Sequence, residues 1–177
     1  PSLTYWDADG KSHGQHPAIL ARMATANGKP ASILRIYLTA DGQKLTLPGV
    51  DVDAKKMMET PSTSPLRGGA IRLSPVAKIL GIAEGVETAL AASEMDGLNV
   101  WAAFSATLME QFVPPCGVDK VVIYADLDKS GRGAEAATRL VERIWEMGIM
   151  ASIKMPEGPI PEGKKGVDWN DVLIQQA

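Results

Sequence analysis

An apolar run in the second half of the chain stops at two aspartates. Residues 121–125 read Val-Val-Ile-Tyr-Ala, and an Asp-Leu-Asp triplet, Asp126–Asp128, and a glycine-rich turn follow them. Five consecutive apolar residues bounded by turn signals are typical of a strand covered on both faces. The helical pattern over 134–147 suits the crossover of a parallel α/β sheet. We therefore predict a buried strand that delivers two carboxylates to a loop.

Asp126 and Asp128 stand where parallel sheets bind ligands, beyond the carboxyl end of a strand. Because they are two residues apart, an extended backbone turns both side chains the same way. No His or Cys stands beside them, and an oxygen-only donor set favours Mg²⁺, Mn²⁺ or Ca²⁺ over zinc. An ordinary acidic turn is the alternative, since Asp, Ser and Gly are also common loop residues.

The same arrangement recurs at a second strand. The apolar run 79–83 ends at Glu84 and Gly85, before a helical pattern over 86–95. We expect further strands and helices at 98–103, near 107–112, and at 120–125, 133–147 and 149–154. Because each of the four strands lies near a helix, the pattern predicts parallel pairing with right-handed crossovers. The segment 156–166 holds three prolines and three glycines and is predicted to loop over an edge of the sheet.

A third acidic cluster, Asp168-Trp169-Asn170-Asp171, closes the chain. Asp168 as the N-cap of a final helix, with Asp171 at its third position, would satisfy free backbone N–H groups. The same carboxylates could instead hold a cation. Both interpretations stay open, since one side chain rarely does both well.

Residues 1–75 have a different pattern. The segments 18–25, 32–39 and 44–50, separated by Asn-Gly and Asp-Gly turns, predict a three-stranded antiparallel meander. Residues 3–6 begin another hairpin, and 70–73 add a strand. The polar stretch 51–69, centred on 60–65, is expected to be a surface connection or a linker. We therefore expect a small antiparallel β-rich subdomain over 1–75 and an α/β domain over 76–177.

Composition limits the class of protein. With 177 residues, 45% of them hydrophobic, the chain can hold one ordinary domain plus a small one. The single cysteine, Cys116, excludes a disulfide framework and a multi-cysteine zinc site within this chain. No apolar run reaches the length of a membrane span, so we expect a soluble, cytoplasmic protein. A start at Pro1 without Met allows that the chain is an excised piece of a longer polypeptide.

The net charge of −3 hides an asymmetry. Residues 1–74 carry 9 Lys and Arg against 6 Asp and Glu, whereas 75–177 carry 9 against 15. The acidity gathers where the metal site is predicted. Clustered carboxylates repel nucleic acid unless cations neutralise them, so this half should need its metal before it meets a phosphate.

Three separated motifs resemble the Toprim domain of DNA primases. They are EGVETALA from Glu84, YADLDKSGRGAEAA from Tyr124 and GVDWNDVL from Gly166. The resemblance is closest to primases encoded by phages, plasmids and other mobile elements, and it covers about residues 75–177. The first 75 residues resemble the region that precedes Toprim in such primases. The resemblance implies a four-stranded, mostly parallel sheet flanked by helices, and synthesis of RNA primers from NTPs on single-stranded DNA.

The resemblance also implies roles for individual residues. Glu84, Asp126 and Asp128 would be catalytic, and together with Asp168 and Asp171 they would bind Mg²⁺ or Mn²⁺. For Glu84 we expect a ligand first and a proton carrier second, because a carboxylate bound to a cation is a poor acid.

Residues around these carboxylates are candidates for phosphate or nucleic-acid contacts. Glycines there allow close backbone approach, and the guanidinium fork matches two phosphate oxygens. Two arginines beside the polar stretch could hold template or primer phosphates, with a solvated rim as the alternative. These candidates are Gly85, Lys129, Gly131, Arg132, Arg67 and Arg72.

Departures from the primase pattern leave other functions open. The chain has neither a zinc module nor a GxxxxGK[ST] motif, so a helicase or a zinc-binding domain would be supplied elsewhere. Toprim domains also occur in nucleases and topoisomerases. A metal-dependent nuclease and a non-catalytic metal- or nucleotide-binding module of a replication assembly remain alternatives. A topoisomerase is disfavoured, because it needs a reactive tyrosine that usually comes from another domain. The tyrosines here are Tyr5, Tyr37 and Tyr124, and Tyr124 lies inside a predicted buried strand.

Overall fold

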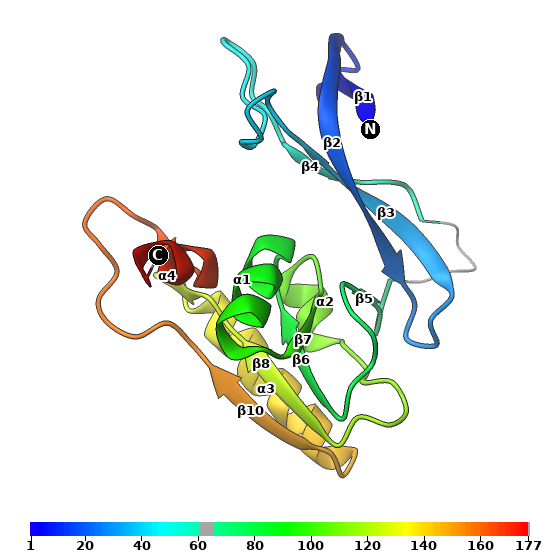
Figure 1. Cartoon of the computed structure of the whole chain (residues 1–177), viewed down its shortest axis with the longest axis vertical. Helices are drawn as coiled ribbons and strands as arrows, with labels where there is room; N and C mark the ends of the chain where they lie inside the picture. Colours follow the sequence, from blue (N-terminus) through cyan, green and yellow to red (C-terminus); the bar gives the residue numbers. More distant parts are fainter. Residues whose placement is uncertain (61–65, 177) are drawn as a thin grey trace.

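The computed structural model describes residues 1–60 and 66–176, in which an α/β layer carries a β-rich extension (Figure 1). In the extension, β1 (Ser2–Trp6) pairs antiparallel with the long β2 (Ser12–Ala24), and β2 pairs antiparallel with β3 (Pro30–Tyr37). A short β4 (Lys55–Met57) covers the other edge of β3. The N-terminal part is therefore antiparallel and β-rich, as predicted.

The predicted third strand of the meander is wrong. Residues 44–50 form only two isolated bridges, Leu38 with Lys44 and Leu47 with Val50. Leu45 is buried in a small cluster with two tyrosines, while the Pro48-Gly49 pair turns the chain. The edge of β3 is free for β4, which lies inside the stretch predicted to be a loop. Residues 61–65 of that stretch lie outside the described part of the chain.

The C-terminal part has the predicted α/β order. Four of its strands form a parallel sheet, in the spatial order β10–β8–β6–β7. The elements along the chain are β6 (Ile79–Ala83), α1 (Val86–Asp96), β7 (Asn99–Ala102), α2 (Ala106–Glu110), β8 (Lys120–Tyr124), α3 (Arg132–Glu146) and β10 (Met150–Lys154). The prediction of a four-stranded parallel sheet with helices is confirmed.

The two parts share one nine-stranded sheet. The link is β5 (Ala70–Ile71), which pairs antiparallel with β7 through Ile71 and Ala102 and with β2 through Met23 and Ile71. A second, two-stranded ribbon joins β9 (Leu127–Asp128) to β11 (Gly166–Val167). It brings the C-terminal α4 (Trp169–Gln176) back to the end of β8.

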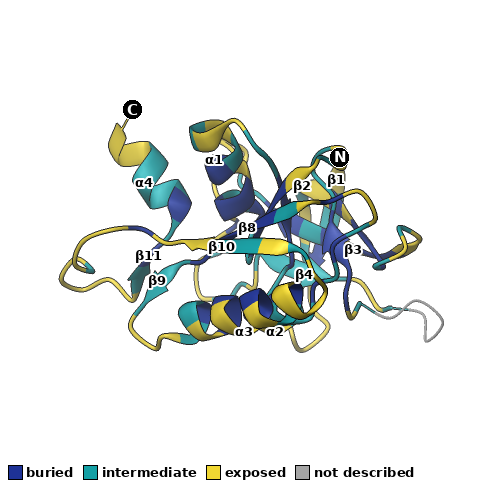
Figure 2. Ribbon diagram, turned by 90° about the horizontal axis from the view of Figure 1, so that it is seen from below, coloured by how far each residue is buried: buried dark blue, intermediate teal, exposed yellow. Residues whose placement is uncertain are grey.

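Helices cover both faces of the parallel strands. Figure 2 shows α2 and α3 on one face, with α1 and α4 on the other. Within residues 1–60 and 66–176, every helix is too short or too polar to span a lipid bilayer.

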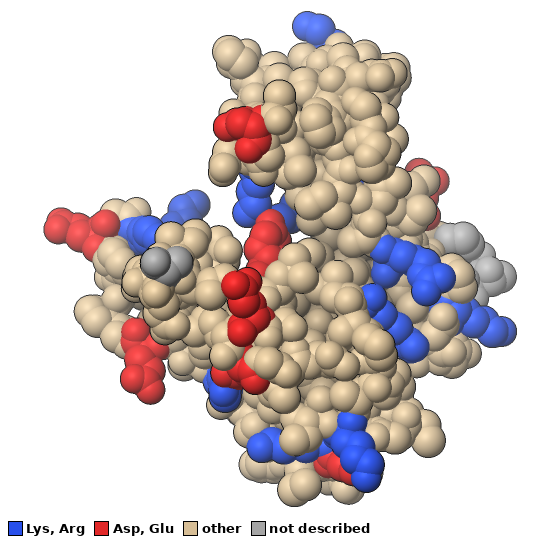
Figure 3. Space-filling view, in the orientation of Figure 1, with Lys and Arg blue, Asp and Glu red and all other residues tan. Residues whose placement is uncertain are grey.

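An ion-pair cluster connects the β-rich extension to α1. Lys55 Nζ lies 2.7 Å and Lys44 Nζ lies 3.2 Å from the Glu87 carboxylate. Figure 3 shows basic side chains of the upper part directly above a column of acidic ones. Glu87 lies in the first turn of α1. Its carboxylate therefore forms ion pairs between the two parts of the chain.

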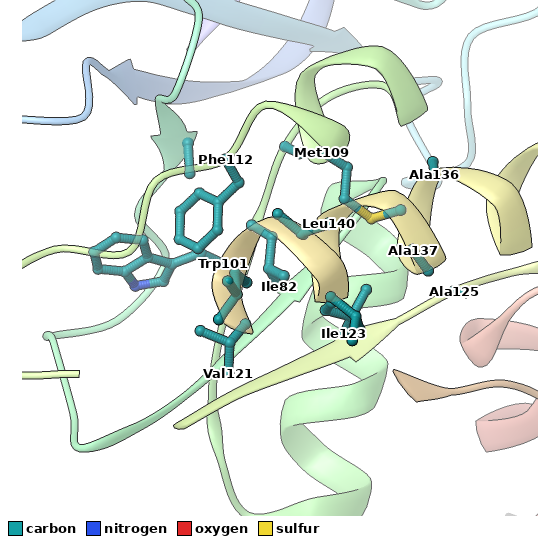
Figure 4. Packing of buried hydrophobic residues seen from close by; sticks show 14 of the residues in the cluster. Ile82, Trp101, Met109, Phe112, Val121, Ile123, Ala125, Ala136, Ala137 and Leu140 are labelled. Atoms are coloured by element: carbon teal, nitrogen blue, oxygen red, sulfur yellow. The ribbon is translucent and has the colours of Figure 1, made fainter. Parts of the chain in front are cut away.

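The core follows the alternation along the central strand. Val121, Ile123 and Ala125 point to one face and pack on α2 and α3 (Figure 4). Val122 and Tyr124 point to the other face and pack on α1. A strand buried on both faces is what the apolar run predicts. The second cluster also contains Met23, Leu34 and Ile36 of the extension, so the two parts share a hydrophobic core.

Candidate active site

Two neighbouring parallel strands deliver Glu84 and Asp126 to the same edge of the sheet. β6 and β8 pair with Ala83 opposite Tyr124, so the residues that follow them emerge side by side. The turn after the next strand holds the backbone of Glu84, since Phe104 N–H donates to the Glu84 carbonyl at 2.7 Å. Phe104 is the one non-glycine residue in the described chain with a left-handed backbone, at φ 81°. Such strained positions cluster at functional sites.

A cleft of about 490 Å³ opens at this edge. It combines the predicted carboxylates with basic and small residues from the turn that follows β8. Its lining is Glu84, Ala106, Asp126, Asp128, Lys129, Ser130, Arg132, Gly133 and Lys165. The structure therefore brings together the three residues that the sequence predicts to be catalytic.

Asp126 is the most perturbed acid of the cleft. Burial, with the charges of Asp168 and Glu84 in addition, raises its pKa to about 7. The Thr88 hydroxyl is its hydrogen-bond donor, at a long 3.3 Å from Oδ1, and this contact only partly offsets the crowding of negative charge. A half-buried carboxylate with unneutralised acidic neighbours is a strong site for a cation.

Asp128 differs from Asp126 because the loop already uses its carboxylate. Its Oδ1 accepts from the Ser130 N–H at 2.8 Å, and its Oδ2 accepts from the Gly133 N–H at 3.0 Å. Hydrogen bonds from Ser130 hold the pKa of Asp128 below its ordinary value. Asp128 therefore braces the start of α3, and the acidic-turn interpretation is correct for its contacts. An ionised carboxylate has further lone pairs, so Asp128 can still face a bound ion.

Burial also raises the pKa of Glu84, and the charge of Asp128 adds to the rise. The Ala106 N–H, Lys55 and Arg132 act in the opposite direction. Glu84 is therefore a half-buried acid in electrostatic contact with both sides of the cleft. Its environment fits either a ligand or a proton carrier.

The third acidic cluster forms a capping box at the start of α4. Asp171 N–H donates to Asp168 Oδ1 at 2.8 Å, and Asp168 N–H reaches back to Asp171 Oδ2 at 3.4 Å. Asp171 is also paired with Lys164 at 2.8 Å, and it does not line the cleft. Its predicted role as a metal ligand is not supported by its position. Asp168 caps the helix and does not line the cleft either, but its charge acts on Asp126.

The donor set fits a hydrated Mg²⁺ or Mn²⁺. All its donors are carboxylate oxygens, the kind that these ions prefer. Among residues 1–60 and 66–176, no three His, Cys, Asp or Glu side chains form a ready metal cage. Mg²⁺ does not need one, because it keeps several waters and binds through one or two carboxylates. Asp126 is the best candidate for direct contact.

The predicted phosphate contacts have different surroundings. Arg132 lines the cleft, but its guanidinium already lies 3.1 Å from Glu110 Oε1 and 3.3 Å from Oε2. Lys129 is exposed and lines the cleft beside Lys165, which sequence reasoning missed. The β9–β11 ribbon brings these lysines together, as Lys129 N–H donates to the Lys165 carbonyl at 3.0 Å. In the described chain neither lysine makes an ion pair.

Arg72, a predicted phosphate contact, is held in contacts away from the cleft. Its guanidinium lies 4.7 Å from the centre of the Trp101 ring. Its Nη2 donates to the carbonyls of Thr25 and Ala26, at 3.4 and 3.2 Å. Arg67 is exposed, and neither arginine lines the cleft.

Arg72→Ala is expected to lower the free energy of unfolding by about 1–3 kcal/mol, because it removes the stacking and both hydrogen bonds. Arg67→Ala, the matched control, should change it by less than about 0.5 kcal/mol. Urea unfolding of both variants measures the difference. Equal free energies of unfolding for the two variants would show that the contacts of Arg72 do not stabilise the fold.

Two glycines of the site differ in what they tolerate. A Cβ on Gly133 would lie 2.9 Å from the Asp126 carbonyl oxygen, whereas on Gly85 it would meet nothing closer than 3.7 Å. Gly133→Ala is therefore expected to cost about 1–3 kcal/mol and to weaken Mn²⁺ binding, since the backbone of Asp126 must move. Gly85→Ala should fold like the wild type. Thermal melts and Mn²⁺ titrations test both, and a normal Gly133→Ala protein would contradict the packing argument.

A family profile described as "Toprim domain" matches residues 79–177, which is more than half of the chain. The chain belongs to the Toprim domain family. The match spans the strands that carry Glu84 and Asp126 and extends through the C-terminal capping box. No curated protein sequence matches the chain.

Solved structures show that the Toprim domain and its β-rich extension share a fold with DNA primases. A DNA primase domain from Pseudomonas aeruginosa is 15% identical, with a TM-score of 0.54, over 98% of this chain and 52% of that one. A DnaG primase catalytic domain bound to ssDNA is 14% identical, with a TM-score of 0.57, over 98% and 54%. The Aquifex aeolicus primase is 16% identical, with a TM-score of 0.52, over 90% and 37%. The chain thus spans about half of the length of the first two.

Proposed function

We propose that this Toprim domain carries out metal-dependent nucleotidyl transfer, as a part of a DNA primase that makes RNA primers on single-stranded DNA. The observation that carries the proposal is the convergence of Glu84, Asp126 and Asp128 on one cleft. The shared fold with primase catalytic domains supports it. Closeness to primases of phages, plasmids and mobile elements stays a prediction from the motifs.

In the proposed reaction the side chains of the cleft hold the metal ion and orient the substrates. Bound Mg²⁺ or Mn²⁺ would neutralise charge on the attacking and leaving oxygens. Asp126 would be the main ligand and Glu84 the second, while Asp128 fixes the loop and faces the ion. Lys129 and Lys165 stand at the same cleft and would contact phosphate oxygens as point charges. Arg132 would join them only after it leaves Glu110, so it is the weaker candidate.

The proposed partners are a single-stranded DNA template and NTPs. We also propose that residues 1–75 act as a subdomain that supports the catalytic domain over 76–177. The family match over 79–177 supports this boundary. The shared cluster that includes Met23 and Leu34 indicates that the two parts stabilise each other. The chain spans about half of the primases it is similar to. A zinc-binding domain or a helicase supplied elsewhere is part of the proposal.

The test is to incubate the protein with Mn²⁺ and either single-stranded template plus labelled NTPs or end-labelled DNA. Template-dependent RNA synthesis, lost in Asp126→Asn, is the expected result. Cutting of the labelled DNA would instead establish a nuclease. Mn²⁺ or nucleotide binding with neither reaction, even with the missing primase portions added, would establish a non-catalytic module.

A further inference from the structure

Trp169 holds α4 against the strand that carries Asp126. Its indole Nε1–H donates to the Ala125 carbonyl at 3.1 Å, in a buried contact. Its ring meets the Tyr124 ring edge-on, with centres 5.4 Å apart and an interplanar angle of 85°. Both partners immediately precede Asp126. The backbone just before Asp126 is therefore tied to the residue just after Asp168.

Leu173 of α4 also packs on the cluster that contains Tyr124, but it is only partly buried. Trp169 is the one buried residue of this helix, and only 9% of its surface is exposed, whereas Ile174 is 65% exposed. On the other side of Asp168, the β9–β11 ribbon ends with Val167 opposite Leu127. Asp168 thus stands between two anchors, and both attach to the chain segment 125–128.

The capping box determines which oxygen of the Asp168 carboxylate accepts a hydrogen bond. Its Oδ1 accepts from the Asp171 N–H at 2.8 Å. Among the described residues, Oδ2 has no hydrogen-bond partner. The carboxylate is thus held by one oxygen while the other is available to a ligand. Its orientation depends on the position of the first turn of α4, which the Trp169 contact sets.

We propose that Trp169 is a positioning residue that places the carboxylate of Asp168 beside Asp126, so that the two acids act on the same divalent cation. The inference rests on the proposed metal-binding function of the cleft. It assigns a role to an aromatic side chain that lies outside the cleft lining and bears no ligand atom of its own. Substitution of residues that orient metal ligands in this way commonly lowers metal affinity by about 10- to 100-fold.

The test is a double-variant cycle read by Mn²⁺ calorimetry on folded protein. Trp169→Phe keeps an aromatic ring near Tyr124 but loses the N–H, and we expect it to weaken Mn²⁺ binding by about 10-fold. Asp168→Asn should weaken it at least as much. The combined variant should bind no more weakly than Asp168→Asn alone, because Trp169 acts through Asp168. Trp145→Phe is the matched control, since Trp145 is 60% exposed on α3, and it should bind like the wild type.

Each outcome decides the proposal. Unchanged affinity in Trp169→Phe, or losses that multiply in the combined variant, would overturn the positioning role while leaving the metal site intact. Failure of the wild type to bind Mn²⁺ would instead overturn the proposed function. If Trp169→Phe does not fold, benzothienylalanine at position 169 keeps the bicyclic ring without the N–H, and the same 10-fold loss is expected.

Discussion

Replacing Asp126 with Asn is expected to abolish Mn²⁺ binding and primer synthesis and to stabilise the metal-free protein at pH 8. Asn keeps an oxygen that accepts from the Thr88 hydroxyl, which lies 3.3 Å from Asp126 Oδ1. The substitution removes the negative charge of Asp126, which the charges of Glu84 and Asp168 repel. The negative charge that would bind the ion is therefore one that destabilises the metal-free fold.

The direction in which pH changes the free energy of unfolding follows from the pKa of Asp126. In the unfolded chain this carboxyl ionises near 3.8, but in the folded protein it ionises near 7. Between these values the folded state holds more protons, so the free energy of unfolding of the wild type falls as the pH rises. The Asn variant lacks this fall and should be about 1–3 kcal/mol more stable than the wild type at pH 8.

Urea unfolding in EDTA at pH 5 and pH 8 measures this effect. The advantage of Asp126→Asn over the wild type should grow between the two pH values. Asp51→Asn is the control, because Asp51 is exposed outside the cleft, and it should change neither stability nor Mn²⁺ binding. An Asp126→Asn protein that is less stable than the wild type at pH 8 would contradict the proposed crowding of charge.

Glu84→Gln is expected to lower the turnover of primer synthesis by about 100- to 1,000-fold, with little effect on folding. Glu84 lines the cleft beside Asp126, and its backbone, which the substitution leaves unchanged, carries the hydrogen bond from Phe104. Single-turnover synthesis at saturating Mn²⁺ separates a loss of chemistry from a loss of metal affinity.

Glu87→Gln, in the first turn of the helix that follows Glu84, is a matched control. Glu87 is paired with Lys44 and Lys55 rather than directed at the cleft. Partly exposed ion pairs of this kind contribute less than about 1 kcal/mol each. A change of about 1 kcal/mol corresponds to a factor of about 5, so turnover should stay within about 5-fold of the wild type. Wild-type turnover in Glu84→Gln, or equal losses in both variants, would show that the assignment of Glu84 is wrong.

Local patterns in the sequence carried the prediction of the α/β part. The run 121–125 is buried on both faces because its neighbours in the sheet are parallel strands with helical crossovers. The continuous apolar run and the acid at its end are visible in the sequence without knowledge of any contact. The convergence of Glu84 with Asp126 follows, since adjacent parallel strands end at the same edge of a sheet.

Features that depend on distant contacts could not be read from the sequence. β9 and β11 are two residues each and lie in stretches rich in Asp, Lys and Gly, so neither has a strand pattern. Their pairing is what brings Lys165 to the cleft. The role of Arg72 likewise depends on Trp101, which is 29 residues away in the sequence. The strand at 55–57 was missed because pairing with β3, rather than its own pattern, defines it.

We propose that carboxylates from separate strands share one divalent ion. A crystal of the protein soaked in Mn²⁺ tests it directly through the anomalous scattering of the metal. We expect a peak within about 2.5 Å of an Asp126 carboxylate oxygen, with Glu84 and Asp168 facing the ion directly or through water. A crystal whose Mn²⁺ peaks all lie away from Asp126 would contradict the claim.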